Sequence, residues 1–155
     1  MRYLKLNTYN DIPRGGEQSE VIWDEQYREF LKEFELVIPR LPKTFIKEFK
    51  KHHLHDSIIN HILIQKINLK RSFRYNFLIE MRDYYNKSTK HTLEFTNVDN
   101  IRSNMMFDFA GVCDWLFCEI LPVNGKRLSF EVMLFDNSFI YFEFSKLKYR
   151  KSSFV

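Results

Sequence analysis

Four histidines and an aspartate near the middle of the chain are of the types that bind metal ions. They are His52, His53, His55, Asp56 and His61. Side chains alternate between the two faces of a strand, so His53, His55 and Asp56 cannot all share one face. The H-x3-H and H-E-x2-H spacings of helical zinc sites are missing, and a third ligand would have to come from elsewhere. We therefore expect a His–Asp pair that anchors a helix-to-strand junction, with no metal and no other cofactor.

Five glutamates fall one per strand on five successive predicted strands. They are Glu80, Glu94, Glu119, Glu131 and Glu143. Paired carboxylates can perform acid–base catalysis when one of them is desolvated. Basic residues occupy neighbouring positions, namely Arg74, Arg82, Lys90 and Arg127. Cross-strand ion pairs therefore explain the glutamates more simply than catalysis does. No serine lies in a glycine elbow, and neither cysteine has the context of a reactive thiolate, so we predict no catalytic residues and no enzyme.

Aromatic side chains share a predicted sheet face with some of these glutamates. Aromatic and charged residues mixed on one face are more typical of an interface than of a plain solvated surface. The predicted partner-binding residues are Trp115, Phe117, Glu119, Glu131, Phe139, Tyr141 and Glu143. The alternative is that the helices cover this face, in which case Trp115 belongs to the core.

Basic and aromatic residues suggest a second use of the surface, namely binding of single-stranded nucleic acid. They occur in the run Lys66–Arg74, at Tyr75, Tyr84 and Tyr85, and in the basic tail 146–155. The net charge of +4 equals the contribution of the tail's four lysines and arginines, so the rest of the chain is balanced. That balance weakens the nucleic-acid hypothesis, and a frayed, solvated tail is the simpler prediction.

Two helices are predicted over about 19–52. Ser19 is a credible N-cap, and an apolar stripe at three- and four-residue steps follows it, formed by Trp23, Tyr27, Phe30 or Leu31, and Phe34. Pro39 and Pro42 interrupt the pattern, and Pro42 suits the first turn of a second helix.

A sheet is predicted over about 54–145. Strands are expected at 54–66, 73–83 and 90–97, with an irregular connection at 97–112. Asn124-Gly125 predicts a type I′ hairpin, and Asp136-Asn137-Ser138 predicts a second turn. The expected core residues are Phe77, Phe95, Phe130, Val132 and Leu134, with Trp23, Phe30 and Phe34 packed onto the sheet. The chain is thus predicted as one α+β domain, residues 1–155, with an N-terminal helix pair on a largely antiparallel meander of about six strands.

Two phrases carry a resemblance to other proteins. Leu54-His55-Asp56 opens a strand after the helices, and the segment from Trp115 to Ile120 precedes the Asn-Gly hairpin. Together they resemble a loose group of small uncharacterised bacterial proteins of low-GC Gram-positive lineages, over about residues 25–145. Some of that group look like immunity proteins of polymorphic toxin systems. The resemblance implies no catalytic residues.

These observations predict a non-enzymatic protein-interaction module, most simply an immunity-type protein whose partner is a toxin domain or another protein. The alternative is a single-stranded nucleic-acid-binding protein. The first residues lack the apolar region of a signal peptide, and no window approaches about 18 uncharged apolar residues. We therefore expect a cytoplasmic protein without a membrane partner.

Overall fold

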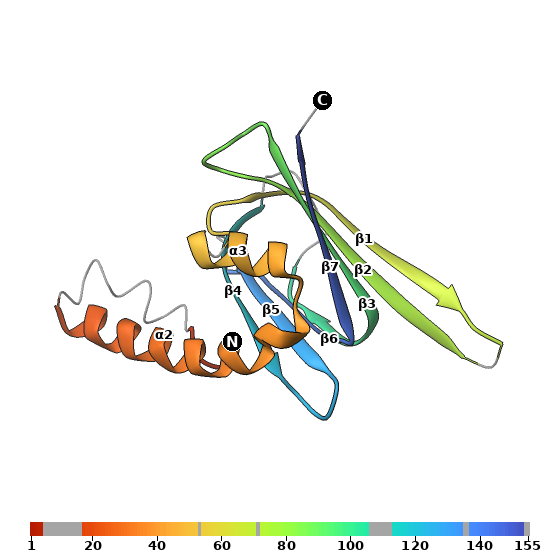
Figure 1. Ribbon diagram of the computed structural model, residues 1–155, viewed down its shortest axis with the longest axis horizontal. Helices are drawn as coiled ribbons and strands as arrows, with labels where there is room; N and C mark the ends of the chain where they lie inside the picture. Colours follow the sequence, from red (N-terminus) through yellow and green to blue (C-terminus); the bar gives the residue numbers. More distant parts are fainter. Residues whose placement is uncertain (5–16, 53, 71, 106–112, 135–136, 154–155) are drawn as a thin grey trace.

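Two helices precede an antiparallel sheet in the computed structural model of the chain (Figure 1). The structure describes residues 1–4, 17–52, 54–70, 72–105, 113–134 and 137–153. Helix α2 (Glu17–Val37), a 3-10 turn η1 (Ile38–Arg40) and helix α3 (Lys43–His52) come first. The described strands are β1 (Ile58–Asn68), β2 (Phe73–Arg82), β3 (Thr89–Ser103), β4 (Cys113–Pro122), β5 (Leu128–Leu134), β6 (Phe139–Phe144) and β7 (Lys146–Ser153). The predicted α+β class, with the helices first and packed on the sheet, is confirmed.

The two helices form because each has one apolar stripe, and Pro39 and Pro42 separate them. Phe30, Phe34 and Val37 of α2 are buried, and the turn that contains Pro39 follows directly. In α3, Phe49 packs against Phe34 with 4.8 Å between ring centroids. Phe45 of the same helix meets Tyr149 of β7 edge-on at 5.8 Å. The stripes therefore join the helices to each other and to the sheet.

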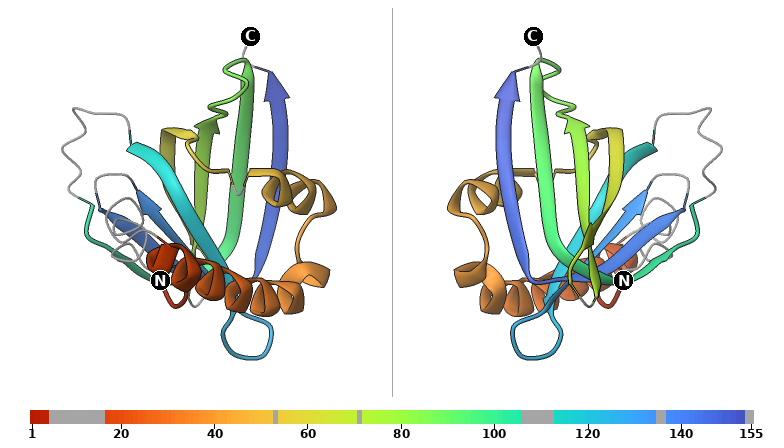
Figure 2. Two further views of the ribbon diagram at one scale, coloured as in Figure 1. Left: turned by 90° about the vertical axis from the view of Figure 1, so that its left-hand side faces the viewer. Right: turned by 90° about the vertical axis from the view of Figure 1, so that its right-hand side faces the viewer.

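The strands form two antiparallel meanders, β1–β2–β3 and β4–β5–β6, joined by one long ribbon. The second half of β3 pairs with β6, and its first half pairs with β7. Because β6 and β7 follow each other with only Ser145 between them, they act as one long partner of β3. Figure 2 shows the two halves of the sheet splaying apart from this ribbon.

The bend of β3 occurs at two asparagines with left-handed backbone. Asn97 has φ 55° and Asn100 has φ 49°. Asparagine tolerates this region better than most residues because its short side chain bonds locally. Register shifts accompany the bend on both sides, one between Tyr75 and Phe77 of β2 and one within the pairing with β6. The bend lets one strand belong to both halves of the sheet.

A cluster of phenylalanine rings fills the space between the two halves. The Phe95 ring centroid lies 4.7 Å from that of Phe130, 4.8 Å from that of Phe142 and 5.0 Å from that of Phe144. Phe77 stacks on Phe142 at 4.6 Å. The predicted core residues are buried: Phe77, Phe95, Phe130, Val132 and Leu134. The period-two alternation thus identified the core face of these strands correctly.

Several expectations need correction. Residues 146–153 of the predicted frayed tail form β7, paired with β3 from Thr89 to Thr96, so the described sheet has seven strands rather than about six. The predicted irregular connection 97–112 is strand as far as Ser103, and its residues 106–112 lie outside the described part. At the Asn-Gly hairpin, Gly125 has positive φ but Asn124 does not, so the turn is not type I′. Asp136 of the second predicted turn lies outside the described residues, and Asn137 has φ 67°.

The central ring cluster should dominate the stability of the fold. Phe130→Ala removes a side chain that is fully buried and in contact with Phe95 and Phe142. We expect it to lower the free energy of unfolding by about 3–5 kcal/mol, measured by urea titration. The matched control is Phe73→Ala, the same change at a ring that is 53% exposed. A cost below about 1 kcal/mol for Phe130→Ala would contradict this packing.

Candidate interaction surfaces

The predicted partner face is not one exposed surface, and Trp115 shows why. The register between β4 and β5 shifts between Trp115 and Phe117, so one extra residue separates them on β4. A bulge of this kind turns the two side chains to opposite faces of the strand. Trp115 is fully buried, and its ring centroid lies 5.6 Å from that of Phe130. The prediction of an outward Trp115 is wrong: the residue belongs to the core, and the bulge places it there rather than a helix that covers the predicted face.

Phe117 and Glu119 do lie on the outer face of β4, but other parts of the chain cover them. The Trp23 ring of α2 meets Phe117 edge-on at 5.4 Å. The Glu119 carboxylate accepts backbone N–H groups of Arg2 and Tyr3, both at 2.8 Å, and that of Leu4 at 2.5 Å. Burial raises the pKa of Glu119, and these N–H donors oppose the rise. Both residues were predicted to be exposed, and both are buried.

The other four predicted residues remain half-exposed on the outer face of β5 and β6, namely Glu131, Phe139, Tyr141 and Glu143. The three polar residues of this group form hydrogen bonds or ion pairs within the chain. Glu131 pairs with the amino group of Met1 at 2.6 Å. Glu143 accepts hydrogen bonds from Asn100 at 2.7 Å and from the Tyr141 hydroxyl at 3.3 Å. The structure thus brings these four together as a small patch whose polar groups are already bonded.

The remaining predicted constellations have structural roles. Glu80 pairs with Lys90 at 3.2 Å, which is an expected cross-strand ion pair, whereas Glu94 pairs at 2.9 Å with Lys148 of β7, a partner that was not predicted. His55 Nδ1 lies 2.7 Å from Asp56 Oδ1 at the helix-to-strand junction, as predicted. Within the described residues, no three potential ligands of the histidine, cysteine or carboxylate type gather as a metal site would require. His53 and the side chain of His52 lie outside the description.

A buried polar chain was missed by the sequence reasoning. His91 Nε2 lies 3.0 Å from Asp83 Oδ2, and His91 Nδ1 lies 2.7 Å from the Tyr149 hydroxyl oxygen. Burial, with the charges of Glu48 and Asp83, raises the pKa of Tyr149, so its hydroxyl stays protonated. The chain therefore ties the β2–β3 turn to β7. In the register of β2 with β3, His91 faces Met81 and Asp83 lies two residues beyond Met81, and Tyr149 lay in the segment predicted to be a frayed tail.

The tip of the β1–β2 hairpin is the part of the sheet that exposes the most apolar surface. Leu63 is 48% exposed, Ile64 43%, Leu69 44% and Phe73 53%. Figure 1 shows this tip on the side of the molecule away from α2 and α3. The ammonium of Lys66 lies 4.4 Å from the centroid of the Phe73 ring. We call Leu63, Ile64, Lys66, Leu69 and Phe73 the hairpin patch, which covers both faces of the hairpin: Ile64, Lys66 and Phe73 lie on one face of the strand pair and Leu63 on the other.

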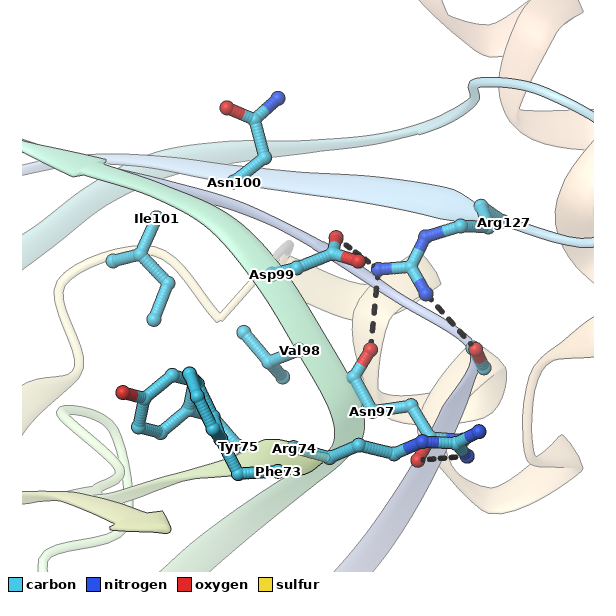
Figure 3. A pocket seen from close by; sticks show the side chains of 10 residues that line it. Phe73, Arg74, Tyr75, Asn97, Val98, Asp99, Asn100, Ile101 and Arg127 are labelled. Atoms are coloured by element: carbon cyan, nitrogen blue, oxygen red, sulfur yellow. Dashed lines mark hydrogen bonds and ion pairs between the residues drawn. The ribbon is translucent and has the colours of Figure 1, made fainter. Parts of the chain in front are cut away.

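A hollow of about 470 Å³ lies beside this patch, between β2 and the bend of β3 (Figure 3). Phe73, Tyr75, Val98 and Ile101 supply its apolar wall. Its polar side is already bonded internally, because the Arg127 guanidinium donates to Asp99, to the carbonyl of Asn97 and to Ser145. Arg74 likewise donates to the Asn97 side chain at 2.9 Å. The hollow thus offers an apolar wall next to arginines that are engaged with the chain.

The predicted nucleic-acid surface is not contiguous. The basic–aromatic run lies at the tip of the hairpin, whereas Tyr84 and Tyr85 follow the opposite end of β2. The segment predicted to be a frayed tail contains β7, where Lys148 pairs with Glu94 and Lys151 pairs with Glu48. Of the predicted group, the structure keeps together only the part at the hairpin tip.

Comparisons with known proteins add no relationship. No protein-family model matches the sequence, and no curated protein matches it significantly. The resemblance to small bacterial proteins therefore stays a prediction. Among the described residues, neither helix is long and apolar enough to cross a membrane.

The Asp83–His91 contact should give the fold a measurable acid sensitivity. Burial alone would raise the pKa of Asp83, but hydrogen bonds from His91 and from the N–H groups of Asn86 and Tyr85 lower it below its usual value. A lowered pKa stabilises the fold above the ordinary aspartate value of about 4 and loses that contribution as the pH falls through the folded value.

Asp83→Asn should therefore cost about 1–3 kcal/mol at neutral pH and flatten the fall in stability below about pH 4. Urea titrations at several pH values measure both effects. Glu94→Gln, which removes an exposed ion pair to Lys148, is the control and should change little. The same acid dependence in Asp83→Asn and in the wild type would contradict this role.

Proposed function

We propose that this protein is a non-enzymatic protein-interaction module that binds its partner at the tip of the β1–β2 hairpin. The observation that carries the proposal is the hairpin patch, in which Leu63, Ile64, Leu69 and Phe73 are all more than 40% exposed. Single exposed apolar residues are common on proteins and need no explanation. Several of them grouped on one projecting element are typical of a surface that is covered in a complex.

The patch has the composition of a protein interface. It combines four exposed aliphatic and aromatic side chains with the cation of Lys66, and Arg74 follows Phe73 directly on β2. Interface energy concentrates in a few apolar side chains that become desolvated, while charges around them set specificity and association rate. The outer-face patch of Glu131, Phe139, Tyr141 and Glu143 is the weaker candidate, because its carboxylates already have partners within the chain.

The resemblance to small bacterial proteins suggests a biological role for this module. An immunity-type protein acts by binding a toxin domain and needs a surface rather than catalytic groups. A basic, apolar hairpin supports that reading if the toxin domain offers an acidic surface. We therefore propose a protein partner, with a toxin domain as the specific case.

Binding of single-stranded nucleic acid is the second candidate function. The observation that favours it is the group of Lys66, Phe73, Arg74 and Tyr75 at the hairpin tip, where the Phe73 and Tyr75 rings meet edge-on at 5.5 Å. Cations beside aromatic rings suit a strand of stacked bases. The exposed side chains of Leu63, Ile64 and Leu69 do not serve that purpose, which favours a protein partner.

Site-specific photocrosslinking separates these functions. A photoreactive amino acid replaces Gln65, an exposed β1 residue beside the patch, in cells that express the chain together with its neighbouring genes. We expect a discrete protein adduct that mass spectrometry identifies as one partner. The control places the same group at Lys148, an exposed residue of β7, and should not give that adduct. An adduct that nuclease removes would contradict the proposed protein partner, and so would equal labelling at both positions.

A further inference from the structure

We infer that the partner adds a β-strand to the open edge of β1, from His61 to Asn68, and that the added strand is an extended segment carrying acidic and aliphatic residues. This inference rests on the proposed function and specifies how the hairpin recognises its partner. Extended segments bind sheet edges through main-chain hydrogen bonds, and their alternate side chains give specificity.

The edge of β1 is open along most of its length. Among the described residues, β1 pairs with β4 at Ile58 and Ile59 and with β2 from one end to the other. From His61 to Asn68, the side of β1 that faces away from β2 has no described strand beside it. These eight residues span about 24 Å, at about 3.4 Å per residue, which is long enough for an ordinary strand.

The unpaired hydrogen-bonding groups of this edge belong to alternate residues. The N–H of Leu69 donates to the carbonyl of Ser72 at 2.8 Å, so Leu69 turns its polar groups toward β2. Residues of an antiparallel pair alternate in this respect, and the register of β1 with β2 is regular from Ile62 to Asn68. The N–H and C=O groups that face the open side therefore belong to Ile62, Ile64, Lys66 and Asn68.

The two outermost strands of this half of the sheet, β1 and β7, differ in the charge of their exposed side chains. β7 carries exposed cations along its length: Lys146, Lys148, Arg150 and Lys151. Charged side chains on an edge strand are a common protection against unwanted pairing. β1 has one exposed lysine, Lys66, and its other exposed residues are the apolar Leu63 and Ile64 and the polar Asn60, His61, Gln65 and Asn68. An edge that lacks this protection, in a chain that protects its other edge, is suited to receive a strand.

The charge of the hairpin identifies the chemistry of the added strand. Residues 57–79 contain no aspartate or glutamate, but they contain Lys66, Lys70, Arg71 and Arg74. In the described part of the chain, no carboxylate forms an ion pair with Lys66, Lys70 or Arg74. Arg74 instead bonds the neutral Asn97, and Lys66 lies over the Phe73 ring. Cations that the fold leaves uncompensated favour acidic residues in the partner.

This charge also decides among the possible occupants. A second copy would bring another hairpin of the same charge to the edge, and like charges at an interface oppose association. A nucleic acid would use the cations but neither the four free N–H groups nor Leu63 and Ile64. An acidic, aliphatic segment of another protein uses all three features.

Capped peptides test the inference directly on the full chain. The probe is an eight-residue peptide of alternating glutamate and valine. Its matched controls are the same peptide with lysine for glutamate and the same peptide N-methylated at alternate residues. Amide chemical shifts report binding. We expect the acidic peptide to shift Ile62, Ile64, Lys66 and Asn68, the N-methylated peptide to bind at least tenfold more weakly, and the lysine peptide to cause no shift.

Two substitutions at one position keep the test independent of folding. Ile64→Pro removes an outward N–H, whereas Ile64→Thr keeps it and also removes an aliphatic side chain. Ile64 is 43% exposed, so both variants should retain the melting temperature within a few degrees, checked by circular dichroism. Binding of the acidic peptide should survive in Ile64→Thr and fall at least tenfold in Ile64→Pro.

Equal binding to both variants, equal binding of acidic and lysine peptides, or shifts centred on another strand would overturn the inference. Dimerisation through β1 in sedimentation, or displacement of the peptide by a single-stranded oligonucleotide with higher affinity, would also overturn it. The inference and the proposed function fail separately. A protein adduct at position 65 without strand-like peptide binding would overturn the added strand but leave a protein-interaction module that uses another mode of recognition.

Discussion

The bent ribbon formed by β3 with β6 and β7 is the constraint on which the arrangement of the sheet depends. One long strand pairs with β7 and β2 in its first half and with β6 in its second half. The backbone of Asn97 and Asn100 allows the change of direction between the halves. The rings of Phe95, Phe142 and Phe144 lie along the same ribbon and fill the angle between the two meanders. Sheet geometry and core packing are thus two consequences of one bend.

The bend also explains why no described strand lies beside the outer edge of β1 from His61 to Asn68. The meander β1–β2–β3 diverges from the meander β4–β5–β6, so β1 and β4 meet at Ile58 and Ile59 and then separate. Charged side chains are a common protection of an exposed edge strand, and an edge without them can pair with another chain. β7, the other outer strand of that half, has the charges, while the described part of β1 exposes aliphatic residues beside uncompensated lysines and an arginine. The inferred addition of a strand to β1 follows from this difference between two edges of one sheet.

The sequence predicted those features that depend on local pattern. The alternation of β2 and β3 identified Phe77 and Phe95 as core, and the aromatic stripe located α2. The features that it missed depend on contacts between distant residues. β7 exists because the segment from Lys146 to Ser153 pairs with residues of β3 that lie 50 to 64 positions earlier, and charge alone suggested a solvated tail.

The candidate site was predicted less well for the same reason. One inserted residue in β4 moved Trp115 to the core, and a bulge leaves little trace in the hydrophobic pattern. Glu119 is buried because the first four residues lie against it, a contact over more than a hundred positions. The hairpin was recognised by its basic and aromatic residues, but its open edge depends on where β4 lies. Local composition therefore located the surface, and only the topology of the sheet shows how it is exposed.

Amide hydrogen exchange along β1 tests the central claim most directly, because it reports whether each N–H of this strand has a partner. The account predicts an alternating pattern in the free protein: rapid exchange at Ile62, Ile64, Lys66 and Asn68, and protection at Leu63, Gln65 and Ile67, whose N–H groups face β2. Protection of all seven amides would show that another segment already covers the edge, and it would contradict the account.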